Sequence, residues 1–222
     1  LKDRPFKAVQ TGGPSGGCIP ENLLDLPVDY EKLTEAGSMM GSGGMIVMDD
    51  RTCMVDVARY FLGFLTEESC GKCTPCREGL KQMLAIYDAL IAGRGRAGDI
   101  ERIETLAAGM QLGSLCELGK SAPNPVLSTL KYFRAEYEAH ISDHACPAGI
   151  CRALTAFEIM DDCDGCHVCF KACPTAAIEG TIKELHVIHH DLCISCGACL
   201  DVCPTDSIRT FPKIELAAKE VV

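Results

Sequence analysis

Four stretches between residues 51 and 142 repeat apolar residues every three or four positions, which is the spacing of one buried face of an α-helix. The four apolar faces begin at Val55, Leu80, Ile100 and Val126. Asp99 stands directly before the third stretch and is predicted to cap its helix. Four amphipathic helices with short connections indicate a small helical bundle.

The segments on either side have other patterns. Residues 1–50 contain two glycine-rich turns, and the short apolar runs 6–9 and 45–48 are expected to be strands. Residues 143–160 are predicted to be a linker, 161–212 a small cysteine-rich module and 213–222 a tail. Residues 93–98 match G-x-G-x-x-G, but they lie between two expected helices, so we predict a turn without a cofactor role. The fold class is therefore α+β.

The composition argues against several classes of function. The 222 residues include 31 Asp and Glu against 21 Lys and Arg, and this acidic balance argues against nucleic acid as the main partner. No apolar run approaches the roughly 18 residues of a membrane span. The chain begins at Leu1 without a signal-peptide pattern, so we expect a fragment that starts inside a larger protein. We find no Ser/His/Asp arrangement and no catalytic residue.

Sixteen cysteines dominate the chemistry, and twelve of them belong to or complete C-x2-C-x2-C groups. That spacing suits metal ligation better than long-range disulfides, and it predicts a reducing, cytoplasmic location. Four cysteines also recur after a shift of 30 residues, each set followed by the same Pro-Thr pair. The two sets are Cys163, Cys166, Cys169, Cys173 and Cys193, Cys196, Cys199, Cys203. This is a duplicated unit.

Each half reads C-x2-C-x2-C-x3-C-P and resembles the bacterial ferredoxins that hold two 4Fe–4S clusters. In that family the fourth cysteine of each half ligates the other cluster. The resemblance therefore assigns two ligand sets: Cys163, Cys166, Cys169 and Cys203 for one 4Fe–4S cluster, and Cys193, Cys196, Cys199 and Cys173 for the other. The alternative is structural zinc at both sites, which would need neither the third C-x2-C step nor the Cys-Pro ending.

A third C-x2-C-x2-C group lies at residues 69–79 and opens an expected helix, with Cys116 as the natural fourth thiolate. This segment and residues 113–116, 121–126 and 132–141 resemble the flavoprotein component of respiratory complex I and its soluble relatives. The resemblance implies a four-helix domain whose 4Fe–4S cluster exchanges electrons with FMN, held by Cys70, Cys73, Cys76 and Cys116. Zinc is the alternative at this site as well.

The first fifty residues fit the same resemblance. Residues 12–17 and 40–44 are similar to part of the family's ubiquitin-like (SLBB) domain. The family's domain for FMN and NAD(P) precedes this region and is not contained in the sequence.

Four cysteines remain after the cluster ligands are assigned. Cys146 and Cys151, together with His140, have the ligand spacing of a tetrahedral zinc site. A fourth ligand is needed, with Cys53 as the first choice and His144 as the second. The alternatives are a further iron–sulfur centre or plain reduced thiols. Cys18 receives no role.

A bundle continued by a two-cluster module resembles the flavin-containing beta subunit of soluble NAD(P)-dependent [FeFe]-hydrogenases, including electron-bifurcating ones. The resemblance implies a complex that couples H2 oxidation to reduction of NAD(P)+ and ferredoxin, in which this chain only transfers electrons. The implied partners are the [FeFe]-hydrogenase catalytic subunit, a small 2Fe–2S thioredoxin-like subunit and soluble ferredoxin. The alternatives are the corresponding subunit of an NAD-linked formate dehydrogenase and a non-catalytic platform that docks ferredoxin.

Overall fold

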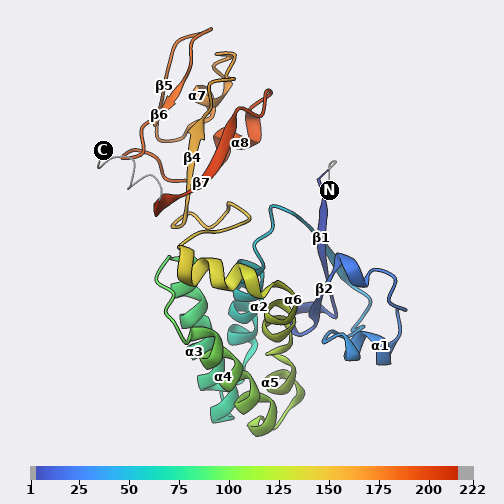
Figure 1. The fold of residues 1–222 in the computed structure, drawn as a ribbon. Helices are drawn as coiled ribbons and strands as arrows, with labels where there is room; N and C mark the ends of the chain where they lie inside the picture. Colours follow the sequence, from blue (N-terminus) through green and yellow to red (C-terminus); the bar gives the residue numbers. More distant parts are fainter. Residues whose placement is uncertain (1–3, 215–222) are drawn as a thin grey trace. The chain divides into compact units, whose positions relative to one another are not determined.

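The computed structural model describes residues 4–214, which form two compact units that divide between Asp143 and His144 (Figure 1). The first unit begins with a sheet of β1 (Phe6–Thr11), β2 (Gly17–Pro20) and β3 (Met45–Asp49). The strand order is β2-β1-β3 and both pairings are antiparallel, so Val9 faces Ile19 on one side and Val47 on the other. β1 and β3 match the expected strands. β2 was not expected, because its four residues follow directly on a glycine-rich turn.

The sheet is anchored to the helices through one of its faces. Ala8, Cys18 and Met48 pack there against Met54, and the backbone N–H of Cys18 donates a 3.0 Å hydrogen bond to the Ser128 hydroxyl. The opposite face carries a separate small core around Val9, Ile19 and Leu33 beside α1 (Tyr30–Glu35). Whether this segment is part of a ubiquitin-like domain stays a prediction.

The helical part contains the four expected helices and a shorter fifth one. Their bounds are α2 Met54–Glu68, α3 Thr74–Ile91, α4 Asp99–Gly113, α5 Glu117–Ser121 and α6 Asn124–Glu138. Each long helix contacts two others, since α2 packs on α3 and α6, and α4 packs on α3 and α6 (Figure 1). The apolar faces predicted from the sequence are the buried ones, for example Leu80, Met83 and Leu90 of α3. The turn at 93–98 connects α3 to α4, as expected.

Two local features differ from the sequence-based expectation. The cap of α4 is Gly98, with φ of 87°, and not Asp99. The buried Asp99 carboxylate instead accepts hydrogen bonds from the Arg96 backbone N–H at 2.9 Å and the Arg102 guanidinium at 3.1 Å. It therefore holds the preceding turn in place. The second feature concerns α6, which is kinked at Phe133. Its C-terminal end continues into a π-helical turn, Ala139–Asp143, that carries His140.

The second unit consists of short elements arranged around the duplicated cysteines. β4 (Thr155–Ile159) pairs with β7 (Ile208–Pro212), β5 (Ile178–Glu179) pairs with β6 (Val187–Ile188), and α7 (Val168–Ala172) contacts α8 (Ala198–Val202). β4 lies inside the segment 143–160 that was expected to be a linker. Its partner strand lies about fifty residues further along the chain, so local pattern could not reveal the pairing. Residues 215–222 of the expected tail lie outside the described residues.

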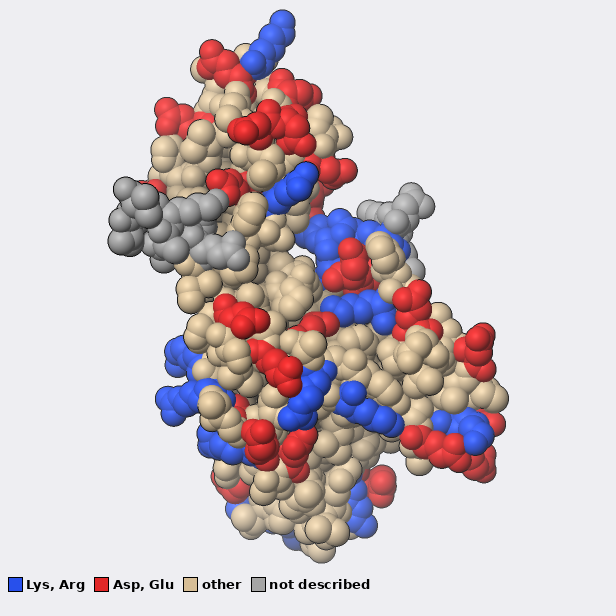
Figure 2. Space-filling view, in the orientation of Figure 1, with Lys and Arg blue, Asp and Glu red and all other residues tan. Residues whose placement is uncertain are grey.

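The surface charge and the helix lengths are the last two general features of the fold. On the face that Figure 2 shows, carboxylates and basic side chains are interspersed, without a continuous basic field. None of the helices among residues 4–214 has the length and apolar character that a membrane crossing requires.

Candidate metal centres

The first cysteine group lies where α3 begins. Cys73 caps the helix, Cys76 occupies its first turn, and Cys116 directly precedes α5. Cys76 is buried, whereas Cys70 and Cys116 are exposed. A metal bound by these thiolates would therefore lie near the surface, with one side toward the helices.

Two glycines allow the loop that carries Cys116 to approach the start of α3. A Cβ atom on Gly113 would lie 2.8 Å from Cγ of Pro75, and a Cβ atom on Gly119 would lie 3.0 Å from Cβ of Cys76. Side chains at these glycines would force the two segments apart. The structure thus brings the Cys116 loop against the C-x2-C-x2-C segment, although 40 residues separate Cys76 from Cys116 in the sequence.

The polar groups around Cys76 suit an anionic sulfur. The Ser69 hydroxyl lies 3.4 Å from Cys76 Sγ, and the N-terminal end of α3 carries a partial positive charge. The Arg77 guanidinium donates to the Gly71 carbonyl at 2.6 Å, which ties the Cys70–Cys73 loop to the helix. Nearby, the buried Ser114 hydroxyl has no hydrogen-bond partner within the described part of the chain. The Ser114 hydroxyl lacks an acceptor and lies beside predicted thiolate ligands, and the sulfur of a bound cluster would serve as that acceptor.

The duplicated unit shows the same backbone twice. Three residues of the first half have positive φ, and their counterparts 30 residues later do as well. The pairs are Gly165 and Ser195, His167 and Gly197, and Ala176 and Asp206. Because residues other than glycine rarely adopt this conformation, its recurrence at non-glycine positions means that both halves wrap in the same way.

The eight cysteines of this unit surround two separate cavities. One cavity is lined by Cys163, Cys166, Cys169 and Cys203. The other is lined by Cys193, Cys196, Cys199 and Cys173. Each cavity therefore takes three cysteines from one half and the fourth from the other, which is the crossed grouping expected from the ferredoxin resemblance. That these groups ligate clusters stays a prediction.

Burial and hydrogen bonding shift the pKa values of three of these cysteines. Burial raises the pKa of Cys199 to about 11 and also raises the pKa of Cys169. Burial of Cys173 acts in the same direction, but hydrogen bonds from the backbone and hydroxyl of Thr175 and from Ala177 outweigh it and lower its pKa. Thiolates at the two buried helix positions need a compensating positive charge, and a bound metal supplies one.

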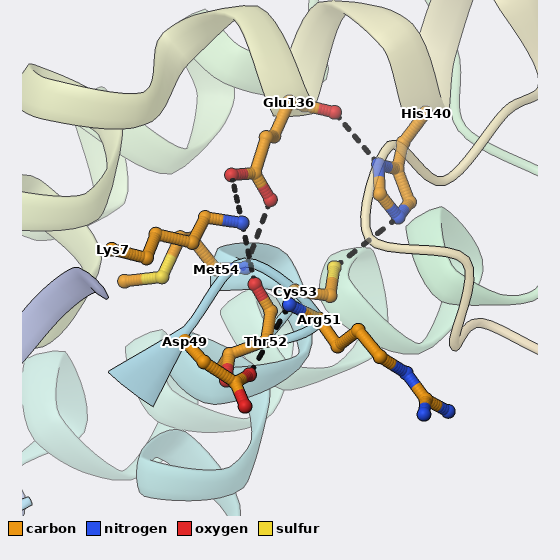
Figure 3. Close-up of polar contacts among 8 residues, drawn as sticks. All are labelled: Lys7, Asp49, Arg51, Thr52, Cys53, Met54, Glu136 and His140. Atoms are coloured by element: carbon orange, nitrogen blue, oxygen red, sulfur yellow. Dashed lines mark hydrogen bonds and ion pairs between the residues drawn. The ribbon is translucent and has the colours of Figure 1, made fainter. Parts of the chain in front are cut away.

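Two of the predicted zinc ligands belong to the first unit and lie close together. Cys53 Sγ is 3.5 Å from His140 Nε2, and both residues are fully buried (Figure 3). Bonds of about 2.3 Å to sulfur and 2.0 Å to nitrogen at a tetrahedral angle give roughly this separation. His140 Nδ1 lies 2.7 Å from the Glu136 carbonyl oxygen, so Nδ1–H donates there and Nε2 keeps its lone pair for a metal.

The other two predicted ligands belong to the second unit. Cys146 and Cys151 place their thiols within 4.8 Å of one another, which is also within reach of one ion. A turn closed by a hydrogen bond from the Gly149 N–H to the Cys146 carbonyl, at 2.9 Å, connects them. His144, the second choice for the fourth ligand, does not join the grouping that these two thiols form.

Cys18 is the cysteine that remains after the fifteen predicted cysteine ligands are assigned, and its surroundings indicate a structural role. It is buried in the sheet and its thiol donates to the Gln10 side-chain oxygen at 3.0 Å. Burial raises the pKa of this thiol to about 12, so it is an unreactive protonated group.

Sequence reasoning missed the residues that support these groups. The buried Glu136 carboxylate accepts from the Lys7 ammonium at 2.7 Å and from the Met54 backbone N–H at 3.0 Å (Figure 3). It thereby joins β1, the first turn of α2 and α6 directly beside Cys53 and His140. Ser69 and Ser114 were also missed, and the only signal in the sequence was their closeness to Cys70 and Cys116.

The fold and its cysteine groups define the class as an iron–sulfur protein with two regions that bind 4Fe–4S clusters. Residues 56–140 match the family described as the NADH-ubiquinone oxidoreductase-F iron-sulfur binding region. Residues 155–210 match the family described as the 4Fe-4S dicluster domain. The second match begins at β4, in agreement with the strand pairing.

Whole-chain comparisons give the nearer relationships. The chain is 49% identical over 184 residues to the HndC subunit of the NADP-reducing hydrogenase of Solidesulfovibrio fructosivorans, covering 82% of this chain and 38% of that protein. It is 46% identical over 147 residues to the F 2 subunit of the NADH-quinone oxidoreductase of Rhizobium meliloti, covering 66% and 35%. By these matches it is a homologue of both. The chain spans well under half the length of these curated relatives.

A solved structure shows the same kind of arrangement. The air-oxidized NAD+-reducing [NiFe]-hydrogenase matches with a TM-score of 0.57 at 33% sequence identity, over 63% of this chain and 24% of that chain. All three comparisons thus relate this chain to the iron–sulfur regions of larger proteins.

Proposed function

We propose that this chain is the electron-transfer part of the NAD(P)H- and FMN-binding subunit of a soluble, multimeric hydrogenase. That complex would couple H2 oxidation to reduction of NAD(P)+ and ferredoxin, with FMN and NAD(P) bound upstream of the present residues. The observation that carries the proposal is the presence of an F-type region and a two-cluster region in one chain. The match to the hydrogenase relative spans 184 residues and the match to the quinone oxidoreductase relative only 147, which favours the hydrogenase.

Three sets of thiolates would hold three 4Fe–4S clusters, as the sequence predicts: the Cys70 set with Cys116, and the two crossed sets of the duplicated unit. When bound, such a cluster supplies one-electron oxidation and reduction without a change of protein ligands. The protein contributes the positions of the thiolates, the hydrogen bonds to sulfur and the exclusion of water. In the second unit Phe157, Ile178 and Ile208 form an apolar core with Cys169 and Cys199, which keeps bulk water from the buried side of both cavities.

We also propose that Cys53, His140, Cys146 and Cys151 bind one zinc ion. The support is the zinc-like separation within the first pair, the Nδ1–H hydrogen bond of His140 and the close approach of the two thiols in the second pair. Only five residues lie between His140 and Cys146 in the sequence, which is a ligand spacing compatible with one zinc ion. Zinc would have a structural role here, since thiolate and imidazole donors that fill all four positions leave no site for a substrate.

The catalytic partner is proposed as an [FeFe]-hydrogenase subunit, with a small 2Fe–2S thioredoxin-like subunit and soluble ferredoxin as further partners. Anaerobic affinity purification of the native complex through this chain, followed by metal analysis, tests the proposal. We expect iron and zinc, with no nickel, molybdenum or tungsten, and H2-dependent reduction of NAD(P)+.

The other metal results would select other assignments. Nickel would indicate a partner like that of the [NiFe]-hydrogenase to which the chain is structurally similar. Molybdenum or tungsten would indicate a formate dehydrogenase. Bound metals that accept no electrons from NAD(P)H or H2 would favour a ferredoxin-docking platform and would contradict the electron-transfer role.

A further inference from the structure

Ser114 carries a buried hydroxyl that is unsatisfied within residues 4–214. Its side chain is 4% exposed, and its Oγ has no hydrogen-bond partner within the described residues. Leaving a hydroxyl buried without a partner destabilises a fold by about 1–3 kcal/mol. Such a group requires an acceptor, and residues 4–214 do not provide one.

The hydroxyl lies beside the buried cysteine of the first group. A Cβ atom placed on Gly119 would be 2.5 Å from Ser114 Oγ and 3.0 Å from Cβ of Cys76, so the serine and the cysteine are neighbours at one point. Ser114 directly follows α4, and Cys116 lies two residues further along the chain. Ser114 is therefore near two of the four predicted ligands without being one of them.

Ser69 provides a second hydroxyl near Cys76, and this one reaches the sulfur. Ser69 Oγ accepts a hydrogen bond from the Gly71 N–H at 3.3 Å, which leaves its O–H to donate toward Cys76 Sγ at 3.4 Å. The Ser69 hydroxyl thus points toward the buried Cys76 sulfur. The Ser114 hydroxyl lies close by without a hydrogen-bond partner among the described residues.

We propose that the Ser114 hydroxyl donates a hydrogen bond to a sulfur of the 4Fe–4S cluster at Cys76 and thereby raises the reduction potential of that cluster. Reduction adds one electron and one negative charge to the cluster, and no proton is transferred to it. A hydrogen bond to sulfur is stronger when the acceptor is more negative, so it stabilises the reduced state more than the oxidised state. Ser114 thus affects the charge balance of the cluster without ligating it. The inference rests on the proposed cluster at this site.

The test is a potentiometric titration of the fully loaded chain, followed by electron paramagnetic resonance at low temperature, for wild type and for Ser114→Ala. We expect one of the three one-electron waves to move to more negative potential while the other two stay unchanged. Loss of one such hydrogen bond should lower the equilibrium constant for reduction on the order of ten-fold, which is about 59 mV for one electron. Ser114→Thr, which keeps the hydroxyl, should return the wave toward the wild-type position.

Ser121→Ala is the matched control. Ser121 is also buried, in the neighbouring helix α5, but its hydroxyl is already bonded to the Glu117 carbonyl at 2.7 Å. Its removal should leave all three waves in place. Ser69→Ala should move the same wave as Ser114→Ala in the same direction, and this independent variant keeps the inference testable if Ser114→Ala loads poorly.

Two results separate this inference from the proposed function. Full iron content with unchanged potentials in both serine variants would overturn the role of the hydroxyls and leave the cluster assignment intact. If the wild-type chain shows only two waves and about eight iron atoms, the cluster at Cys76 does not exist and the proposed function fails first.

Discussion

Cys53 Sγ lies 3.5 Å from His140 Nε2, although 87 residues separate the two side chains in the sequence (Figure 3). The cysteine directly precedes α2, and the histidine stands in the π-helical turn after α6. Both are fully buried, so the start of one helix and the end of another are joined by two residues that can ligate a metal.

Replacement of Cys53 tests the proposed zinc site. Cys53→Ser should reduce bound zinc from about one per chain to near zero, because serine is a poor zinc ligand, while iron and sulfide remain unchanged. Anaerobic metal analysis measures both. Cys18→Ser removes an equally buried thiol outside this group and should keep the zinc. Unchanged zinc in the Cys53 variant would show that this cysteine is not a ligand.

The Glu136 carboxylate is expected to stabilise the first unit through Lys7 and the first turn of α2. Glu136→Ala leaves the partly buried Lys7 ammonium with the Thr52 carbonyl but without its carboxylate partner, and should lower the free energy of unfolding by about 2 kcal/mol. Glu136→Gln retains an acceptor for the Met54 N–H and should lie between the alanine variant and wild type. Anaerobic urea denaturation followed by circular dichroism gives these values.

The exposed ion pair between Lys32 and Glu35, at 2.7 Å, provides the control for charge removal. Glu35→Ala should leave stability within error, because solvent screens exposed pairs. An equal loss in the Glu35 and Glu136 variants would contradict a special role for the buried carboxylate.

The raised pKa of Cys18 predicts a specific dependence on pH. The folded pKa is about 12 against an ordinary value of 9.0, so the neutral thiol adds stability that is complete below pH 9 and is lost as pH rises toward 12. In the folded protein at pH 9, iodoacetamide should label Cys18 far more slowly than in urea, as measured by peptide mass spectrometry. Equal rates in both conditions would mean that the thiol is accessible and ionised in the fold.

The crossed grouping in the second unit predicts which cysteine variants share an effect. Cys163 and Cys203 line one cavity, and Cys173 lines the other. Combining Cys163→Ser with Cys203→Ser should disturb a single cluster and leave about eight iron atoms per chain. Combining Cys163→Ser with Cys173→Ser should disturb two clusters and leave about four. The reverse order of iron contents would show that each half binds its own cluster.

The sequence was most informative where ligand spacing and duplication determine geometry. The crossed arrangement of Cys173 and Cys203 could be expected because each half resembles the bacterial two-cluster ferredoxins, in which the fourth cysteine of a half ligates the other cluster. The helix faces were predictable because burial follows the helical period. In contrast, β4 pairs with a strand far along the chain, and the donors that reach the Glu136 carboxylate come from β1 and α2 through tertiary packing. The unsatisfied hydroxyl of Ser114 is visible only once its surroundings are known.

The central claim is that the chain holds three 4Fe–4S clusters and one zinc ion, and anaerobic quantitation of iron, acid-labile sulfide and zinc tests it most directly. We expect about twelve iron, an equal amount of sulfide and about one zinc per chain. Near sixteen iron without zinc would contradict the zinc assignment and indicate a fourth cluster. Zinc in place of iron throughout, in protein never exposed to air, would contradict the electron-transfer function.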